Sequence, residues 1–382
     1  MIAWLPYLVG WTAGWLMLWR LWPLPIHPAV STEPDTSIVP DTSIVPDTSI
    51  VPATSPGDAR SPQRVSRSAI AVIVPARNES STLPTVLAAL VAQLRPGDEL
   101  VVVDDHSTDR TAAVAASLGA RVLSATDFDK QWMGKPHACW QGANSTTAPM
   151  LVFIDADVDP SHDLLDRLAA TINDGEVVSV QPLHRTESLY EQGSMLFNIV
   201  AMMGCANFTV MGRRAASVMA FGPVLAVTRT TYNKIGGHAH PGVRHVGLED
   251  IALARAVGAS RVFSGNPDTA FRMHPGGWRE MVRGWTRSFT GGLSATPWWA
   301  TIAIAAWVWS VAGGWLAWPW AYPLTAVQLL ILGRRAGRFN PLTALLFPVT
   351  TLFFVAVVGR GLVLRATGRS VRWKDRPMSN RS

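Results

Sequence analysis

The stretch that decides the fold is MLVFIDADVDP, residues 150–160. The apolar run that opens it predicts a strand buried on both faces, and this strand stops at three carboxylates, Asp155, Asp157 and Asp159. Carboxylates at the carboxyl end of a central strand lie where open α/β sheets bind ligands. Two acids separated by one small residue suit a hard divalent cation that also carries a phosphate. The stretch therefore predicts a metal and phosphate site at a strand end.

The third acid of this stretch differs from the first two in its neighbours. Asp159 is followed by Pro160 and by a Ser-His-Asp turn, a sequence typical of the start of a helix. We therefore predict that Asp159 caps the next helix, and that Asp155 and Asp157 form the metal pair.

The residues around this stretch alternate short apolar strands with helices. Besides the strand that ends at Ile154, strands are predicted at 69–74, 99–103, 120–123, 177–181, 222–228 and 261–264, and helices at 82–94, 109–118, 135–146, 187–205 and 249–257. This order, with continuous apolar strands, indicates an α/β fold with a mainly parallel sheet covered by helices on both faces.

The composition of the chain indicates membrane segments. Of 382 residues 48% are hydrophobic, 17 are Trp and only 16% are charged. The net charge of +6 comes largely from Arg beside apolar runs, which favours an anionic membrane surface as partner. We expect no nucleic-acid partner, because no binding fold or aromatic-basic motif is present. Cys139 and Cys205 have no metal-ligand spacing and form no disulfide framework, so we expect two buried core residues.

The first 68 residues are predicted to hold an anchor and a linker. Residues 1–22 are apolar, with no charge before Arg20 and no small-residue cleavage site, which favours an uncleaved membrane anchor. Arg20 after the span places the following domain in the cytoplasm of a multi-pass cell-membrane protein. Residues 23–68 contain three copies of PDTSIV and have the composition of a solvated linker.

The chain after the last predicted strand becomes Trp- and Arg-rich and then membrane-like. Residues 273–296 are predicted to form an interfacial segment, and residues 297–365 hold three apolar segments of about the length of a span. The RRAGR loop at 334–338 and the tail at 366–382 are both basic, although one span between them would put them on opposite sides. Two arrangements stay open: a hairpin broken at Pro348, or a tail that departs from the positive-inside rule.

Polar residues follow the first two strands predicted from residue 69 onward. Arg77 and Glu79 come after Pro75 on a loop that leads into a helix. A helix N-terminus suits an anionic or nucleotide ligand, although an ordinary connecting loop has the same composition. Asp104 and Asp105 end the second strand, where a carboxylate can accept hydrogen bonds from a base or a ribose. Capping of the next helix does not explain two adjacent acids.

One lysine has a position that suits a phosphate. Lys135 follows a glycine in WMGKPHACWQGA, residues 132–143, and precedes a predicted helix. A point charge at this place can lie near a diphosphate, while the absence of the Walker spacing argues against an ATP-binding loop.

Two later motifs supply a candidate base and a candidate contact with a substrate. Glu249 and Asp250 open a helix in HVGLEDIALARAV, where the helix dipole favours acids in any case. Because Gly247 precedes them, we expect them to be exposed and able to act as a general base. Arg283 and Trp285 lie in MHPGGWREMVRGWTRSF, residues 273–289, which fits an interfacial amphipathic helix and also substrate contact.

The motifs PARNE, DDHSTDRT, GKPHACWQG, DAD and LED occur in this order, followed by a Trp/Arg segment before apolar segments. In this the chain resembles family 2 glycosyltransferases with the GT-A fold. The HPGGW…RGWTRSF block and the tail GRSVRWKDR (368–376) look more like the branch of carotenoid-acid glycosyltransferases. The resemblance covers about residues 69–290, and the membrane part more loosely.

The resemblance implies a Rossmann-like nucleotide-sugar domain at residues 69–272 and a role for each motif residue. Asp104 and Asp105 would hold the uracil and ribose of a UDP-sugar, with Pro75, Arg77 and Glu79 lining the same pocket. Lys135 would lie near the nucleotide. Asp155 and Asp157 would hold Mg²⁺ or Mn²⁺ against the diphosphate. Asp250, with Glu249 beside it, would be the catalytic base of an inverting transfer to a lipid-soluble acceptor.

Other functions are weighed against this one. Processive polysaccharide synthases carry a Q/RxxRW motif, and the nearest match here, from Arg279 to Trp285, has a different spacing. This favours transfer of one sugar over polymer synthesis. A non-catalytic scaffold that keeps the fold is a further alternative, against which the full set of acidic motifs argues. A haloacid-type phosphatase would need its nucleophilic Asp on the first strand, which here ends in Pro75-Ala-Arg.

Overall fold

The computed structural model describes residues 4–21, 25, 67–128, 131–214, 218–265, 267–292, 295–367, 372–373 and 376–377. Nearly all of the predicted linker, residues 23–68, and most of the predicted basic tail, residues 366–382, lie outside these described residues.

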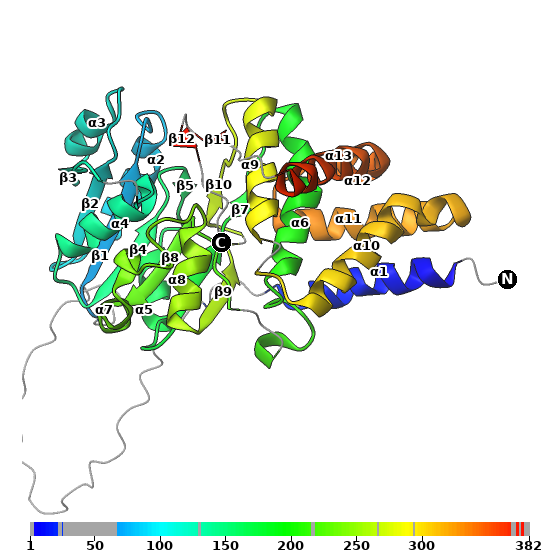
Figure 1. Ribbon diagram of the computed structural model, residues 1–382, viewed down its shortest axis with the longest axis horizontal. Coiled ribbons are helices and arrows are strands. Elements are labelled where there is room, and N and C mark those ends of the chain that lie inside the picture. The colour runs from blue at the N-terminus through cyan, green and yellow to red at the C-terminus, as the bar shows by residue number, and fades with distance from the viewer. Residues whose placement is uncertain are drawn as a thin grey trace, which may run out of the picture.

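A seven-stranded sheet forms one side of the molecule (Figure 1). Its strand order is β3-β2-β1-β4-β8-β6-β9. The bounds are β1 Ile70–Ala76, β2 Glu99–Asp104, β3 Arg121–Ser124, β4 Met150–Ile154, β6 Val177–Gln181, β8 Val224–Thr228 and β9 Ser260–Ser264. Only β8 runs antiparallel to its neighbours, β4 and β6, among these strands. The predicted α/β fold with a mainly parallel sheet is confirmed.

Helices cover both faces of this sheet because its strands are apolar on both sides. In β1, Ile70, Val72 and Val74 face one core, which includes α2 (Leu83–Val91), α3 (Thr111–Ser117) and α5 (Leu164–Thr171). Ala71 and Ile73 face the other core, which includes α4 (Gly134–Asn144), α7 (Arg229–Ile235) and α8 (Glu249–Val257). The continuous apolar strands therefore form a sheet with helices on both faces, as expected for parallel strands.

A small second sheet follows the DAD stretch. It has the order β5-β10-β7, with β5 at Val158–Asp159, β7 at Leu183–His184 and β10 at Ala270–Phe271. The prediction that Asp159 caps a helix is wrong. Asp159 pairs with Ala270, its carboxylate lies 3.3 Å from Arg185 Nη1, and Asp163 stands before α5 instead. The partner strand comes far later in the chain, so the local sequence could not reveal this pairing.

The remaining helices pack together beside the sheet (Figure 1). They are α1 Leu5–Met17, α6 Met195–Gly204, α9 Trp278–Gly292, α10 Trp298–Ala317, α11 Ala321–Ala336, α12 Pro341–Leu345 and α13 Phe347–Ala366. Short elements complete the described chain: the 3-10 helices η1 Leu189–Ser194, η2 Gly212–Arg214 and η3 Gly237–Ala239, and the strands β11 Arg372–Trp373 and β12 Arg376–Pro377.

Two of these helices are long and apolar enough to cross a membrane, with spans at Trp298–Leu316 and Phe347–Ala366. Helix α1 has 13 residues and is not one of the two, so the predicted anchor at residues 1–22 stays a prediction. It packs along α10, where Gly10 lies so close to Ala306 that a side chain would not fit. The hairpin alternative required a break at Pro348. The helix is instead interrupted at Leu346, and Pro348 lies in the first turn of α13, where proline costs no helical hydrogen bond.

Candidate active site

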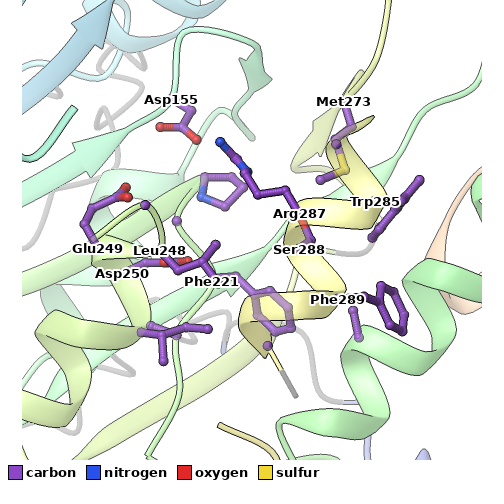
Figure 2. Close-up of a pocket in the computed structure, with 18 of the residues that line it drawn as sticks. Asp155, Phe221, Leu248, Glu249, Asp250, Met273, Trp285, Arg287, Ser288 and Phe289 are labelled. Carbon is purple, nitrogen blue, oxygen red and sulfur yellow. The ribbon is translucent and has the colours of Figure 1, made fainter. Parts of the chain in front are cut away.

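A cavity of about 590 Å³ lies where the carboxyl ends of β1 and β4 meet the packed helices (Figure 2). The site residues predicted from the sequence that line it include Pro75, Arg77, Glu79, Asp105, Lys135, Asp155, Asp157, Glu249 and Asp250. Trp285 lines it as well. The structure does not place Asp104 or Arg283 among the lining residues.

The end of β4 directs two carboxylates into this cavity. The strand itself is buried, and the Asp155 N–H donates to the carbonyl of Pro223 at 3.0 Å. Ala156, between the two acids, also lines the cavity, while Val158, which follows, is buried in the core. Burial, together with the charges of Asp155 and Glu79, raises the pKa of Asp157 to about 8. Burial also raises the pKa of Asp155.

Lys135 connects the two acidic motifs of the cavity. It lies in the first turn of α4, and its Nζ is 2.7 Å from Asp155 Oδ1 and 2.8 Å from Glu249 Oε1. Burial opposes the charged form of the lysine, but the two carboxylates raise the pKa of Lys135 well above its usual value. Burial likewise opposes ionisation of Glu249, and Lys135 lowers the pKa of Glu249. The three side chains therefore form an ionic bridge on the wall of the cavity, in which only Glu249 is buried.

The two acids of α8 have different environments. Glu249 is only 6% exposed, so the expectation that Gly247 leaves it exposed is wrong, while Asp250 is half-buried. Burial and then the charge of Glu249 raise the pKa of Asp250 to about 7, a value suited to proton transfer near neutral pH. Gly222 lies beside it, and a Cβ there would be 3.2 Å from both Asp250 Oδ2 and Lys135 Nζ. Because glycine has no side chain, Gly222 does not crowd the Asp250 carboxylate or the Lys135 ammonium group.

The two acids that end β2 are separated by the backbone. Asp105 is buried and lines the cavity, with Arg77 Nη1 at 3.9 Å from Oδ2 and His106 Nδ1 at 3.0 Å from Oδ1. Asp104 instead accepts a hydrogen bond from the Ser107 N–H at 3.3 Å. Only Asp105 is thus available to a ligand in the cavity, and its partner His106 was not among the predicted site residues.

Helix α9 places one arginine inside the cavity and one outside. Arg283 is exposed, whereas Arg287, one turn later, lines the cavity. Figure 2 shows Arg287 extending from α9 toward Asp155, opposite Glu249. Trp285 is buried, donates from Nε1 to Ser194 Oγ at 2.9 Å and stacks on Phe197. Arg283 and not Arg287 was predicted to contact the substrate, because the sequence pattern places both on neighbouring turns of one helix and does not show which of them faces a cavity.

Beyond Arg287 the cavity becomes apolar. This apolar half is formed by α6, α9, α10 and α13, two of which are the candidate membrane spans. Its lining includes Val200, Gly204, Phe289, Ile304, Val308, Phe354 and Val358. A ligand that fills the whole cavity must therefore combine a polar end with an apolar body.

The acids at the end of β4 fit a divalent cation that brings further ligands with it. The described residues contain no group of three His, Cys, Asp or Glu side chains that could hold a metal by themselves. Magnesium commonly uses one or two carboxylates together with substrate phosphates, which matches Asp155 and Asp157. The acids that line this half of the cavity outnumber its cations, so a bound divalent cation would offset an excess of negative charge.

The sequence is similar to known proteins over most of its length. A model of the family described as glycosyl transferase family 2 matches residues 71–229. The chain is 32% identical over 339 residues to the 4,4'-diaponeurosporenoate glycosyltransferase of Staphylococcus aureus strain MRSA252, which covers 82% of this chain and 89% of that relative. The protein of the same name from strain USA300 is 31% identical over 338 residues, with the same coverage.

Solved structures show a more distant similarity. A mannosyltransferase of Pyrobaculum calidifontis, in complex with GDP-Man and Mn²⁺, is 19% identical and covers 79% of this chain and 91% of its own, with a TM-score of 0.48. Glucosyl-3-phosphoglycerate synthase from Mycobacterium tuberculosis is 20% identical, with coverage of 60% and 80% and a TM-score of 0.39.

Proposed function

The chain belongs to glycosyl transferase family 2, and we propose that it moves a sugar from a UDP-sugar to the carboxyl group of an apolar lipid at a membrane. The observation that carries this proposal is the continuity of one cavity from the acids of β4 and α8 to an apolar half between candidate membrane spans. Glycosyl transfer itself follows from the family. Donor, acceptor and location are the proposed parts.

The acceptor is proposed from the polarity of the cavity. Its apolar half suits a long hydrocarbon, and Arg287 lies between that half and the acids. A guanidinium group can hold a carboxylate through two parallel hydrogen bonds. The relatives act, by their name, on diaponeurosporenoate, whose ending denotes a carboxylate. A carotenoid-like acid would put its chain among the helices and its carboxylate at Arg287.

The donor is proposed to lie along the strand ends. Asp105 offers a buried carboxylate that can accept hydrogen bonds from a base or ribose, with Arg77 beside it. Asp155 and Asp157 would hold Mg²⁺ or Mn²⁺, which supplies positive charge against the diphosphate of the leaving group. Lys135 lies where its ammonium can contact the same diphosphate.

The reaction is a direct displacement at the anomeric carbon. An acceptor oxygen forms the new bond from one face while the bond to the diphosphate oxygen breaks on the other, so the configuration inverts. The electron pair leaves with the nucleoside diphosphate. A hydroxyl acceptor must lose its proton, and the carboxylate of Asp250 can take it. A carboxylic acid is already ionised at neutral pH, so for that acceptor Asp250 has no proton to remove.

The location is proposed from the helices. The two candidate spans and the exposed apolar side chains on α10 and α13 support attachment to a bilayer. The predicted arrangement is a multi-pass protein of the cell membrane with the sugar-transferring domain in the cytoplasm. Its support remains Arg20 and the basic residues at the end of α11. A scaffold function and polymer synthesis have less support, because the relatives are named as glycosyltransferases of a defined small acceptor.

The test is a donor panel with the full chain in nanodiscs. UDP-sugars, an apolar carboxylic acid and a membrane lipid extract are incubated with Mn²⁺, and the products are identified by mass. We expect a single added sugar. Asp157→Asn should lower transfer about a hundredfold or more, the order lost when a group that stabilises developing charge is removed.

The matched control for this variant is Asp268→Asn, which makes the same change at an exposed residue outside the cavity. Its activity should equal that of the unmodified chain. Full activity of Asp157→Asn would contradict the metal assignment, and products with many added sugars would favour a polymerase.

A further inference from the structure

Lys135 already provides the positive charge at one of the two proposed metal ligands. Its Nζ lies 2.7 Å from Asp155 Oδ1, the distance of a strong charge-assisted hydrogen bond. The same nitrogen lies 2.8 Å from Glu249 Oε1, so two of its three N–H groups are used. Lys135 also lines the cavity, which gives it access to a ligand there.

The ammonium group of Lys135 and a metal ion compete for the carboxylate of Asp155. Both cations need lone pairs of the same carboxylate, and a divalent cation held there would repel a neighbouring ammonium. Glu249 offers Lys135 a second partner that is buried and lies on a different helix. The lysine can therefore give up Asp155 without losing every ionic contact.

We propose that Lys135 is an exchangeable internal cation: it holds Asp155 while the site is empty, yields that carboxylate to the metal, and then contacts the donor diphosphate while Glu249 retains it. This inference rests on the proposed function. It makes binding of metal and donor interdependent, since the metal alone must displace Lys135, whereas the metal with a diphosphate gives the displaced ammonium a new anionic partner. Metal and nucleotide should then increase the affinity of the site for each other equally.

The test measures binding and needs no turnover. Mn²⁺ alone is titrated into the full chain in nanodiscs and followed by the paramagnetic resonance of the free ion, and UDP is then titrated by calorimetry at saturating Mn²⁺. In Lys135→Met we expect Mn²⁺ alone to bind about tenfold tighter, because a competing unit charge is removed. UDP should bind about tenfold weaker, because a charged contact is lost.

A second variant separates competition from general loosening of the site. In Glu249→Gln the lysine keeps Asp155 as its remaining ionic partner, so Mn²⁺ alone should bind no tighter than in the unmodified chain. Lys234→Met, at an exposed lysine in the last turn of α7, controls for loss of a positive charge elsewhere and should leave both affinities unchanged. Circular dichroism and the thermal midpoint show that each variant is folded.

The outcomes distinguish the inference from the proposed function. The exchange is supported if Lys135→Met, and neither of the other two variants, binds Mn²⁺ more tightly and UDP more weakly than the unmodified chain. Unchanged or weaker Mn²⁺ binding in Lys135→Met, or equal tightening in Glu249→Gln, overturns it while leaving the metal site in place. If the unmodified chain binds no Mn²⁺ even with UDP, the metal part of the proposed function fails, and the exchange fails with it.

Discussion

The polar and apolar halves of the cavity are built by different means. The polar half is built by strand and helix ends, which place Asp105, Asp155 and Glu249 through the backbone that carries them. The apolar half is built by side chains that meet between four helices. The first arrangement follows from short stretches of sequence, while the second depends on how distant helices pack. We infer that the polar half fixes the reaction and the apolar half selects the acceptor.

The two halves also differ in charge. The polar half has six acids, Glu79, Asp105, Asp155, Asp157, Glu249 and Asp250, and three cations, Arg77, Lys135 and Arg287. The apolar half is lined only by uncharged side chains. An acceptor carboxylate that reaches the reacting centre must therefore pass from an uncharged region into an acidic one. Among the residues that line the cavity, Arg287 is the cation on the acceptor side, opposite Asp155 and Glu249.

The largest expected effect is a loss of transfer to one class of acceptor only, caused by a substitution in the polar half. Asp250→Asn cannot take a proton, so transfer to an apolar alcohol should fall by about 10²- to 10⁴-fold. Transfer to an apolar carboxylic acid should fall much less, because that acceptor is ionised without a base. The measurement is the initial rate with two acceptors of equal chain length that differ only in the end group. Equal losses for both acceptors would show that Asp250 does not act as a proton acceptor.

The second largest effect is expected at Arg287, which lies between the polar and the apolar half of the cavity. Arg287→Met removes the proposed partner of the acceptor carboxylate, and a charged hydrogen-bonded contact contributes about 1.5–3 kcal/mol, or roughly 10- to 100-fold in kcat/KM. The alcohol acceptor should be affected less. Arg283→Met makes the same change one turn earlier on α9 at an exposed position, and it should retain nearly full activity. If Arg283→Met were the more damaging variant, the prediction from the sequence would be restored.

The contrast between these two arginines shows what the sequence could and could not predict. The strands that end just before Asp105 and Asp155 were predicted within a few residues, because each is a local apolar run followed by polar residues. Whether Arg283 or Arg287 faces the cavity depends on how α9 packs against α13 and α6. The sequence around the two arginines does not determine this packing. The pairing of Asp159 with Ala270 escaped prediction for the same reason, since its partner is distant in the chain.

The third prediction tests the apolar half by filling it. Ile304→Trp enlarges a side chain that lines the cavity on α10, and the lost space should weaken binding of a long apolar acid by about 1–3 kcal/mol, on the order of tenfold. UDP binding should not change, because the polar half is untouched. Ile302→Trp is the matched control, since Ile302 lies on the same helix and is 62% exposed. Equal acceptor affinity in both variants would mean that the acceptor does not enter between the helices.

The smallest expected effect comes from one methyl group added to the polar half, at Gly222. In Gly222→Ala the new Cβ would lie 3.2 Å from Asp250 Oδ2 and from Lys135 Nζ, closer than ordinary contact. Both groups must shift by a few tenths of an ångström, so transfer to the alcohol should fall roughly two- to fivefold, with little change in the free energy of unfolding.

The same substitution at Gly313, on α10, meets nothing within 4 Å. It should leave transfer unchanged and stabilise the helix by about 0.5–1 kcal/mol, because alanine loses less backbone freedom than glycine. The initial rates and thermal midpoints of the two variants measure this difference. A rate loss confined to Gly222→Ala would show that the polar half depends on exact spacing between Asp250 and Lys135. Equal rates would mean that these two side chains adjust freely, and that the backbone does not fix the geometry of the polar half.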